Sequence, residues 1–293
     1  MRDDITIIVN SCDKYEDAWN PFFKIFKDEW PECSYPVILN TEYKAYDCPY
    51  MNVKTVCTGS ENSWTARVRK IVSETDTKYY LLILEDFFFL SPVNNSLFEK
   101  SFELMKNDES IGFLEYDPRG CGIHGEKKLN EMFYEWKKHK VRVNAELALW
   151  RREFLLEMLF LDVDPWRFEL NSAICSLYSK YKSAYVSHEY SIFDYSINPK
   201  YGYGITAGKW LNKNEELFKK HSVDVNFNNI GVMKSDVTYS SLRIQRSGLD
   251  DRGKLPLLKR IRLFGRDIIR KYRKYKANKK LIKEFKIYLK SSE

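Results

Sequence analysis

No stretch of this sequence approaches the roughly 18 consecutive apolar residues that a membrane-spanning helix needs, so we expect no integral membrane protein. The N-terminal apolar run, residues 5–9, is too short for a signal peptide, and no small-residue cleavage site follows it. The six cysteines are scattered without a CxxC pair, so the sequence contains neither a zinc motif nor a disulfide framework. We therefore expect reduced thiols and a cytoplasmic location.

Short motifs of several enzyme classes are also missing. No GxGxxG loop follows the first predicted strand, which disfavours a nicotinamide or flavin dinucleotide site. HExxH and GxSxG motifs are absent, so hydrolases have no basis in the sequence. A sugar nucleotidyltransferase stays open as an alternative, although it normally has a Gly-rich basic loop after the first strand to bind a triphosphate. Residues 11–14, Ser-Cys-Asp-Lys, do not form such a loop.

The composition is that of a globular protein. The chain has 293 residues, of which 44% are hydrophobic and 30% charged, so one large domain, alone or with an appendage, can bury an ample core. Aromatic residues reach 15%, with 20 Tyr and 18 Phe. This exceeds the need of a core built from aliphatic layers and predicts clefts lined by rings.

Positive charge is concentrated at the C-terminus. Residues 250–293 hold 16 Lys and Arg against 5 Asp and Glu, whereas residues 1–249 hold 32 against 36. Apolar residues recur in this tail at helical spacing, namely Ile261, Phe264, Ile268, Tyr272 and Tyr275. We predict a domain over residues 1–245 and a basic amphipathic helical tail over 246–293.

Such a tail fits the headgroup layer of an anionic membrane, which would place the protein at the inner face of the cell membrane as a peripheral protein. Two alternatives stay open: the apolar stripe packs on the body of the protein, or it pairs with a second copy in a homo-oligomer. We expect no nucleic-acid partner, because the acidic body offers no basic groove.

Apolar runs and helical patterns alternate in the first half, which predicts an α/β fold with a central, mostly parallel sheet flanked by helices. The predicted strands cover residues 5–9, 36–39, 53–57, 79–84, 111–116, 141–149 and 184–187. The predicted helices cover residues 19–29, 64–74, 97–106, 152–160 and 165–179. Asn62 or Ser63 and Asp164 precede two of them as N-caps. Residues 201–210 are predicted to form a loop.

Polar residues follow the first four predicted strands. They are Asn10 and Ser11, Asn40 and Thr41, residues 58–60, and Glu85 and Asp86. Ligands of an open parallel sheet gather at the carboxyl ends of its strands. Hydroxyl and amide groups there favour a nucleoside over an apolar ligand.

Glu85 and Asp86 are the most informative pair. Two acids directly after a buried strand are costly to bury unless a positive group meets them, such as a divalent cation on a diphosphate. Alternatively they cap the next turn, or pair with Arg67 or Arg69. The later glycines Gly202, Gly204 and Gly208 indicate either a loop over the site or an ordinary turn.

Eight segments, in order, resemble a family of bacterial glycosyltransferases of the GT-A fold. They are residues 11–15 (SCDKY), 19–23 (WNPFF), 35–42 (YPVILNTE), 64–67 (WTAR), 84–88 (LEDFF), 148–155 (ALWRREFL), 165–169 (PWRFE) and 208–210 (GKW). The resemblance implies a Rossmann-like GT-A domain, a nucleoside diphosphate sugar as donor and a saccharide acceptor, which we expect to be lipid-linked. It also implies a role in the synthesis of a surface polysaccharide, such as capsule or lipopolysaccharide.

From their positions we expect Asn10, Ser11, Asn40, Thr41 and Arg67 to hold the nucleotide, with Lys70 and Glu85 also at the donor. The resemblance implies that Glu85-Asp86 takes the place of the family's Asp-any-Asp motif. Asp86 then contacts the donor or a bound Mn²⁺ or Mg²⁺, but Leu84 stands where the first Asp of the motif belongs. Without a metal, Arg67, Lys70 or a cation of the tail must stabilise the leaving group. His188 is a candidate metal ligand, or a structural histidine.

An inverting transfer needs a carboxylate to accept the proton of the acceptor hydroxyl. Glu169 is our candidate, and Glu115 and Asp117 are the alternatives beside the acceptor. Glu169 could instead be a first-turn acid that only interacts with the helix dipole. Trp166 could stack on a sugar ring or belong to the core. A further alternative for the whole protein is a non-catalytic carbohydrate-binding scaffold at the membrane.

Overall fold

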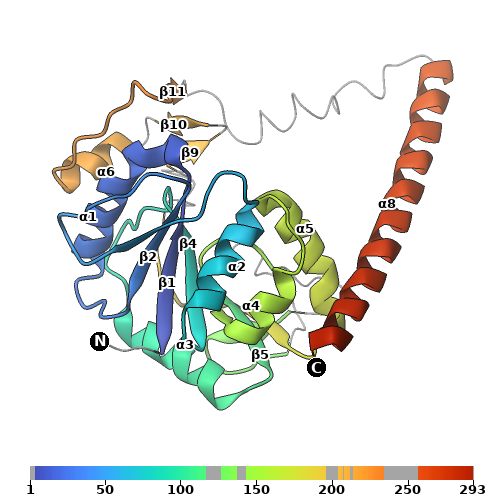
Figure 1. The fold of residues 1–293 in the computed structure, drawn as a ribbon, viewed down its shortest axis with the longest axis horizontal. Coiled ribbons are helices and arrows are strands. Elements are labelled where there is room, and N and C mark those ends of the chain that lie inside the picture. The colour runs from blue at the N-terminus through green and yellow to red at the C-terminus, as the bar shows by residue number, and fades with distance from the viewer. Residues whose placement is uncertain are drawn as a thin grey trace.

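The computed structural model describes residues 4–116, 127–136, 143–195, 204–206, 208–211, 214–233 and 257–292, with the side chains of the last range described from residue 274 to 291. Its centre is an eight-stranded sheet with the order β3-β2-β1-β4-β7-β5-β8-β6 (Figure 1). The strands are β1 (Ile5–Asn10), β2 (Val37–Thr41), β3 (Lys54–Cys57), β4 (Tyr79–Leu84), β5 (Ile111–Glu115), β6 (Phe133–Glu135), β7 (Ala148–Arg151) and β8 (Lys182–Val186).

Strands β3, β2, β1 and β4 are parallel to one another, and β7 and β6 run antiparallel to their neighbours. The predicted α/β class with a mostly parallel central sheet is confirmed. The order β3-β2-β1-β4 is that of a Rossmann-like half-sheet, in which the chain reverses its winding direction between β1 and β4.

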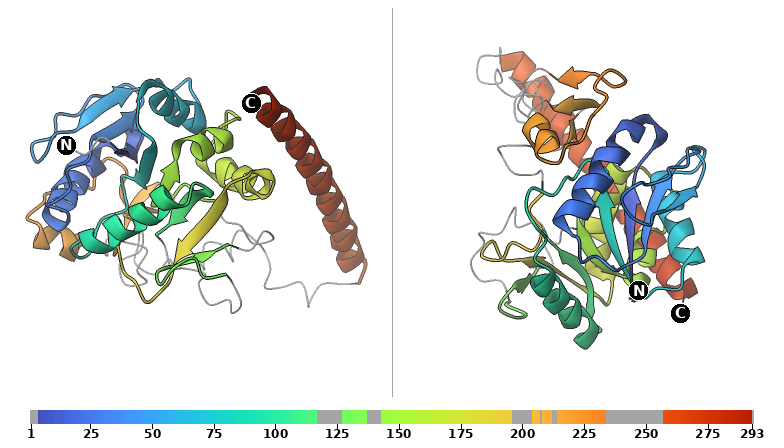
Figure 2. Two further views of the ribbon diagram at one scale, coloured as in Figure 1. Left: turned by 90° about the horizontal axis from the view of Figure 1, so that it is seen from below. Right: turned by 90° about the vertical axis from the view of Figure 1, so that its left-hand side faces the viewer.

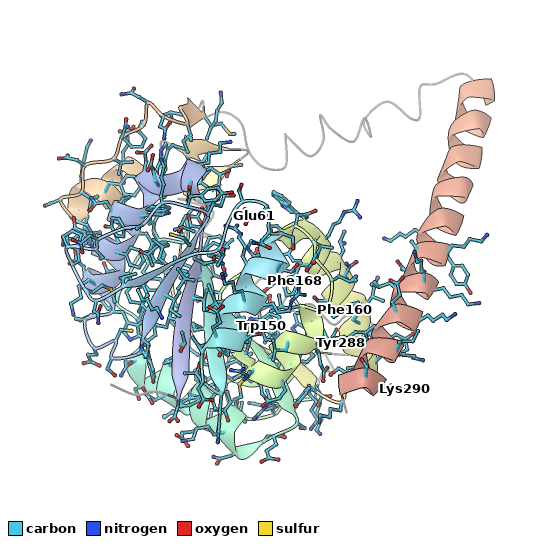
Figure 3. The ribbon with its side chains drawn as sticks, in the orientation of Figure 1. Glu61, Trp150, Phe160, Phe168, Tyr288 and Lys290 are labelled. Carbon is cyan, nitrogen blue, oxygen red and sulfur yellow. The ribbon has the colours of Figure 1, made fainter. Side chains whose placement is uncertain are left out.

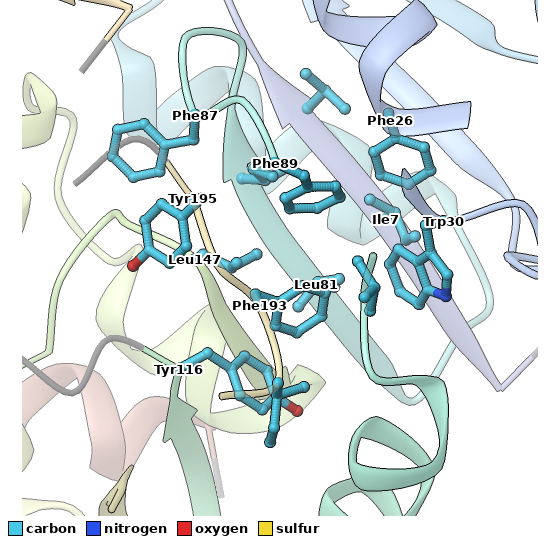
Figure 4. Close-up of a cluster of buried hydrophobic side chains, with 14 of the residues drawn as sticks. Ile7, Phe26, Trp30, Leu81, Phe87, Phe89, Tyr116, Leu147, Phe193 and Tyr195 are labelled. Carbon is cyan, nitrogen blue, oxygen red and sulfur yellow. The ribbon is translucent and has the colours of Figure 1, made fainter. Parts of the chain in front are cut away.

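Helices cover both faces of this sheet. The helices are α1 (Trp19–Glu29), α2 (Trp64–Glu74), α3 (Asn95–Asn107), α4 (Arg152–Met158) and α5 (Pro165–Cys175), with 3-10 turns η1 (Asp13–Ala18) and η2 (Ser176–Tyr178). Because side chains alternate along a strand, Ile7 packs in one core with α1 and α3, and Ile8 in the other with α2, α4 and α5. Figure 4 shows the first core around Phe89 and Phe193, and Figure 3 labels Trp150 and Phe168 in the second.

Both predicted caps are present: Ser63 accepts from the N–H of Ala66, and Asp164 from that of Arg167. Two predicted elements are shorter than expected. The helix predicted over residues 165–179 ends at Cys175 and continues only as η2. The strand predicted over 141–149 is wrong for residues 143–147, because β7 begins at Ala148; residues 141–142 lie outside the described part.

A second, three-stranded sheet lies beyond the C-terminal edge of β1 and β4 (Figure 1). It consists of β9 (Ile205–Thr206), β10 (Lys209–Leu211) and β11 (Val232–Met233), and α6 (Glu215–Lys220) accompanies it. The loop predicted over residues 201–210 is therefore wrong at β9 and β10. Residues of this segment form strands because they bury a large side chain. The Trp210 ring is 0% exposed and stacks on Phe88, four residues after the end of β4.

The tail forms one helix, α8 (Leu257–Ser292), as predicted. Its C-terminal end lies against the body beside α5, and its other end extends away (Figures 1 and 2). Leu281 and Phe285 are buried in the second core, where Phe285 contacts Phe160 with ring centres 5.1 Å apart. Tyr275, the one residue of the predicted stripe whose side chain is described, is 62% exposed. No helix in the described ranges is long and apolar enough to span a bilayer.

Candidate active site

The carboxyl ends of β1 and β4 lie side by side where the strand order reverses, which is where an open α/β sheet binds its ligands. Asn10 and Ser11 end β1, and Glu85 and Asp86 follow β4. The fold therefore brings together the two groups of polar residues that the sequence suggested.

The predicted nucleotide residues form a connected chain of hydrogen bonds. The Asn40 amide donates to Oδ1 of Asn10 (3.0 Å), and the Thr58 hydroxyl donates to Oδ1 of Asn40 (3.0 Å). The Ser11 hydroxyl accepts from the indole of Trp19 (2.7 Å). Nδ2 of Asn10 is buried without a hydrogen-bond partner among the described residues. Asn10 thus keeps one donor for a ligand, because buried polar groups are rarely left unpaired.

Thr41 has a local role instead. Its hydroxyl donates to the backbone carbonyl of Lys44 (2.7 Å) and so supports the loop after β2. No specific role for Asp13 was predicted, although its carboxylate fixes the same loop. That carboxylate accepts the backbone N–H groups of Glu42 (3.1 Å), Tyr43 (3.1 Å) and Lys44 (3.2 Å). The loops after β1 and β2 are therefore held as one unit.

Arg67 supplies a buried positive charge below the site. Its residue is 6% exposed, and its Nε and Nη1 have no hydrogen-bond partner in the part of the chain that the structure describes. Glu85 is equally buried, and burial together with the charge of Asp86 raises its pKa well above the ordinary value, while Arg67 opposes this. The suggested pairing with Arg69 is wrong, because Arg69 binds Asp162 on the outer side of α2.

Asp86 is covered by the second sheet. The backbone N–H of Ile205 donates to Oδ2 of Asp86 (3.1 Å), and that of Gly204 donates to the carbonyl of Asp86 (2.9 Å). A Cβ at Gly204 would lie 2.4 Å from the Phe88 ring, so only glycine allows this close approach. Burial raises the pKa of Asp86 to about 7, although the bond from Ile205 lowers it. Gly204 and Gly208 thus flank or join the paired strands β9 and β10 next to Asp86, and Gly202 lies outside the described residues.

Residues 143–147, just before β7, contact or lie near the other predicted acids and Asp86. The Asn144 amide donates to Glu115 (2.7 Å), and the N–H of Ala145 donates to Glu169 (3.1 Å). The next residue, Glu146, is near enough to Asp86 for its charge to raise the pKa of that carboxyl. Three successive residues thus touch or influence Glu115, Glu169 and Asp86.

The acids differ in accessibility. Glu115 is 1% exposed, and its second oxygen accepts from the indole of Trp136 (3.1 Å), so both oxygens are occupied. Glu169 on α5 is half-buried, which keeps it open to an acceptor. Asp117, the other alternative, lies outside the described residues.

Three predicted residues lie farther out. Lys70 is exposed on α2, and Trp166 is 74% exposed at the start of α5. His188 is exposed in the turn that follows β8. Among the described residues no group of three or more His, Cys, Asp and Glu could hold a metal ion. No reaction step below depends on a protein-held cation.

No protein-family model matches the sequence, and no curated protein matches it. Several solved structures are similar at low identity. Residues 1–349 of S. aureus TarS give a TM-score of 0.42 at 11% identity, over 66% of this chain and 59% of that one. The same protein in complex with UDP-GlcNAc gives 0.40 at 10% identity, over 66% and 57%. A mycobacterial protein gives 0.41 at 8% identity, over 64% and 65%. The chain thus spans less than two thirds of each, and the likeness does not extend to activity.

Proposed function

We propose that this protein is a glycosyltransferase that moves a sugar from a nucleoside diphosphate sugar to a saccharide acceptor. The main support is the arrangement at the switch point of the sheet. A buried guanidinium, Arg67, has two nitrogens without partners, and it lies beside the acids that end β4. Buried N–H donors without partners are costly, and the oxygens of an anionic ligand such as a diphosphate would accept from them. The resemblance of the sequence to GT-A glycosyltransferases supports the same function.

Each residue group has a chemical role in this proposal. Asn10 Nδ2 and Arg67 bind the nucleotide, and Asp86, held by the N–H of Ile205, contacts the donor sugar. The acceptor hydroxyl oxygen attacks the anomeric carbon, and its proton moves to the carboxylate of Glu169. The bond from the anomeric carbon to the diphosphate oxygen breaks, and the electron pair stays on that oxygen. The nucleoside diphosphate then leaves.

Several finer points belong to the proposal. The acceptor is a saccharide on a lipid carrier at the cytoplasmic face of the membrane, and the product enters a bacterial surface polysaccharide. The basic helix α8 holds the protein at the anionic lipid surface. Mn²⁺ or Mg²⁺ bound by the diphosphate itself would neutralise part of the negative charge on the leaving group.

Release of nucleoside diphosphate from a panel of nucleotide sugars, with saccharide acceptors present, tests this function. UDP-GlcNAc, with which TarS was solved, is a suitable first donor. We expect turnover by the wild type and a loss of about 100-fold or more in Asp86→Ala and Glu169→Ala. Glu157→Ala is the matched control, because Glu157 is also a half-buried helical acid, accepts a hydrogen bond from the Ser179 hydroxyl (2.6 Å), and belongs to α4.

The variants also separate the alternatives. Loss of turnover in both site variants, with melting temperatures near that of the wild type, supports the enzyme. A wild type that binds glycan but turns over no donor of the panel favours the carbohydrate-binding scaffold. Incorporation of a nucleoside triphosphate into a nucleotide sugar would point to the nucleotidyltransferase.

A further inference from the structure

We infer that Lys14 is the cation that binds the diphosphate of the donor and stabilises the leaving nucleotide. This inference rests on the proposed function and adds to it the residue that replaces the charge of a protein-held metal. The sequence suggested Arg67, Lys70 or a tail cation for this task. The geometry points to Lys14 because it is an exposed ammonium, without an ion-pair partner among the described residues, on a fixed turn next to the cover of the site.

The backbone of Lys14 is firmly positioned. Lys14 lies in η1, which begins two residues after Ser11 at the end of β1. Asp13 ties this turn to the loop after β2 by accepting three backbone N–H groups, and the N–H of Tyr15 closes the turn on the carbonyl of Cys12 (3.0 Å). A residue fixed in this way needs little reorganisation when charge develops on a ligand.

The side chain of Lys14 reaches the turn that covers the site. A Cβ added at Gly208 would lie 3.2 Å from Nζ of Lys14 and 3.8 Å from the hydroxyl of Tyr15. Gly208 has φ +77°, and the strand on its other side holds Asp86 through Ile205. Lys14 therefore extends from the end of β1 to the cover of the site.

Tyr15 connects this position to the acids. Burial raises the pKa of Tyr15 to about 12, and the charges of Cys12, Glu85 and Asp86 add to that shift. The Tyr15 ring is therefore close to the acids after β4, while Nζ of Lys14 lies 5.5 Å from the centre of the same ring. The Tyr15 ring thus contacts Lys14 and is near enough to Glu85 and Asp86 for their charges to act on it.

Lys14 is also available. It is exposed and has no ion-pair partner among the described residues. Its neighbour Lys44 differs in this respect, because Lys44 is bound to Glu16 with an N–O distance of 2.5 Å. Lys70 is near enough to Glu61 for its charge to help lower the pKa of that carboxyl, which also accepts from the Tyr43 hydroxyl (2.8 Å). Of these three lysines, only Lys14 combines a free charge with contact to the cover.

Its chemical role follows from the reaction. As the anomeric carbon–oxygen bond breaks, negative charge grows on the diphosphate oxygen that keeps the electron pair. The ammonium of Lys14 donates hydrogen bonds to the diphosphate, as a compact point charge does well. Arg67 on α2 and Lys14 in η1 then neutralise the negative charge of the diphosphate from two different elements.

Two measurements on Lys14→Met test this inference. We expect kcat to fall about 100-fold, the scale for loss of one oxyanion-stabilising donor, while KM for the acceptor stays unchanged. Lys14→Arg should keep most of the activity because it keeps the charge. Lys44→Met is the matched control and should behave as the wild type.

The second measurement does not depend on turnover. The dissociation constants of UDP and UMP, or of GDP and GMP if the guanine nucleotides bind, are compared in the wild type and Lys14→Met. We expect the wild type to prefer the diphosphate and the variant to lose about 10-fold of this preference. An unchanged preference together with wild-type kcat overturns the role of Lys14. If the wild type binds no nucleotide at all, the proposed function itself fails.

Discussion

The backbone N–H of Ile205 donates a hydrogen bond to the carboxylate of Asp86 over 3.1 Å, joining residues that lie 119 positions apart in the chain. This bond places the cover of the site directly over the acid that follows β4. It also stabilises the charged form of a carboxyl that burial would otherwise keep protonated. The contact therefore couples the position of the small sheet to the ionisation of Asp86.

Asp86→Asn should change the pH dependence of stability. The pKa of Asp86 is raised to about 7, so the folded protein binds this proton more tightly than the unfolded chain does. Wild-type stability then falls as pH rises from about 4 to about 7, and Asp86→Asn escapes this loss. We expect the variant to be about 2 to 4 kcal/mol more stable than the wild type at about pH 8 and equal to it at about pH 4. Urea unfolding at both pH values measures this, and a variant that is less stable at the higher pH contradicts it.

Arg67→Met should separate stability from binding. Because two nitrogens of Arg67 are buried without partners, its replacement by an apolar chain of similar length should leave the melting temperature unchanged or raise it. Nucleotide binding should be lost in the same variant. Arg69→Met is the control: it removes an ion pair to Asp162 and a bond to the Leu159 carbonyl, so it should lower stability and keep nucleotide binding.

His221→Ala should loosen the small sheet. His221 lies after α6, and its side chain is 5% exposed; its Nδ1 is hydrogen-bonded to Asp28 of α1 (2.8 Å), and its Nε2 lies 3.1 Å from Glu29 without a hydrogen bond. Hydrogen bonds to charged groups contribute about 1.5 to 3 kcal/mol, so we expect a loss of about 2 kcal/mol and faster proteolysis within residues 204–233. The exposed His188→Ala serves as the control, and equal stability of the two variants would refute the role of His221.

The stability that the contact between Asp28 and His221 provides should depend on pH, because Asp28 titrates with a lowered pKa. Burial alone would raise its pKa, but the hydrogen bonds of Lys24 and His221 lower it below the ordinary value. The contribution of Asp28 to stability is therefore present above about pH 4 and is lost as pH falls through the lowered pKa. Asp28→Asn should be less stable than the wild type at about pH 7, and the difference should shrink toward about pH 2.

The outer face of α8 should bind anionic lipid. Its exposed lysines include a set at alternating steps of three and four, Lys276, Lys279, Lys283, Lys286 and Lys290. Each contributes about 1 kcal/mol near an anionic surface, so changing Lys279, Lys283 and Lys290 to Glu should weaken binding to phosphatidylserine vesicles by about 100-fold or more. The same change at the exposed Lys54, Lys100 and Lys219, which lie on other elements, is the control. Equal loss in both triple variants would show a non-specific charge effect.

The sequence predicted those parts of the fold in which local pattern and burial agree. β1 and β4 are continuous apolar runs, and α1 and α2 were predicted with their observed ends because each carries a clear apolar face. The small sheet was missed because its strands have only two or three residues. They depend on distant contacts, such as the stacking of Trp210 on Phe88.

The candidate site residues also divide into those that local sequence pattern predicts and those that depend on distant contacts. Strand-end residues such as Asn10 and Asp86 could be found because a parallel sheet places its carboxyl ends at one edge. The roles of Asp13 and Lys14 could not, since they depend on backbone groups of the loop after β2 and on the turn at Gly208. The buried anchor of α8, Phe285, lies beyond the apolar stripe that marked the tail as amphipathic.

Thermal unfolding with UDP, GDP, CDP, CMP and dTDP, each with and without Mn²⁺, tests the central claim most directly. A nucleotide at about 100 times its dissociation constant adds about 2.7 kcal/mol to the free energy of unfolding, which raises the melting temperature measurably. We expect such a rise with at least one nucleoside diphosphate for the wild type and none for Arg67→Met. A panel without any rise for the wild type would contradict a nucleotide site at the ends of β1 and β4.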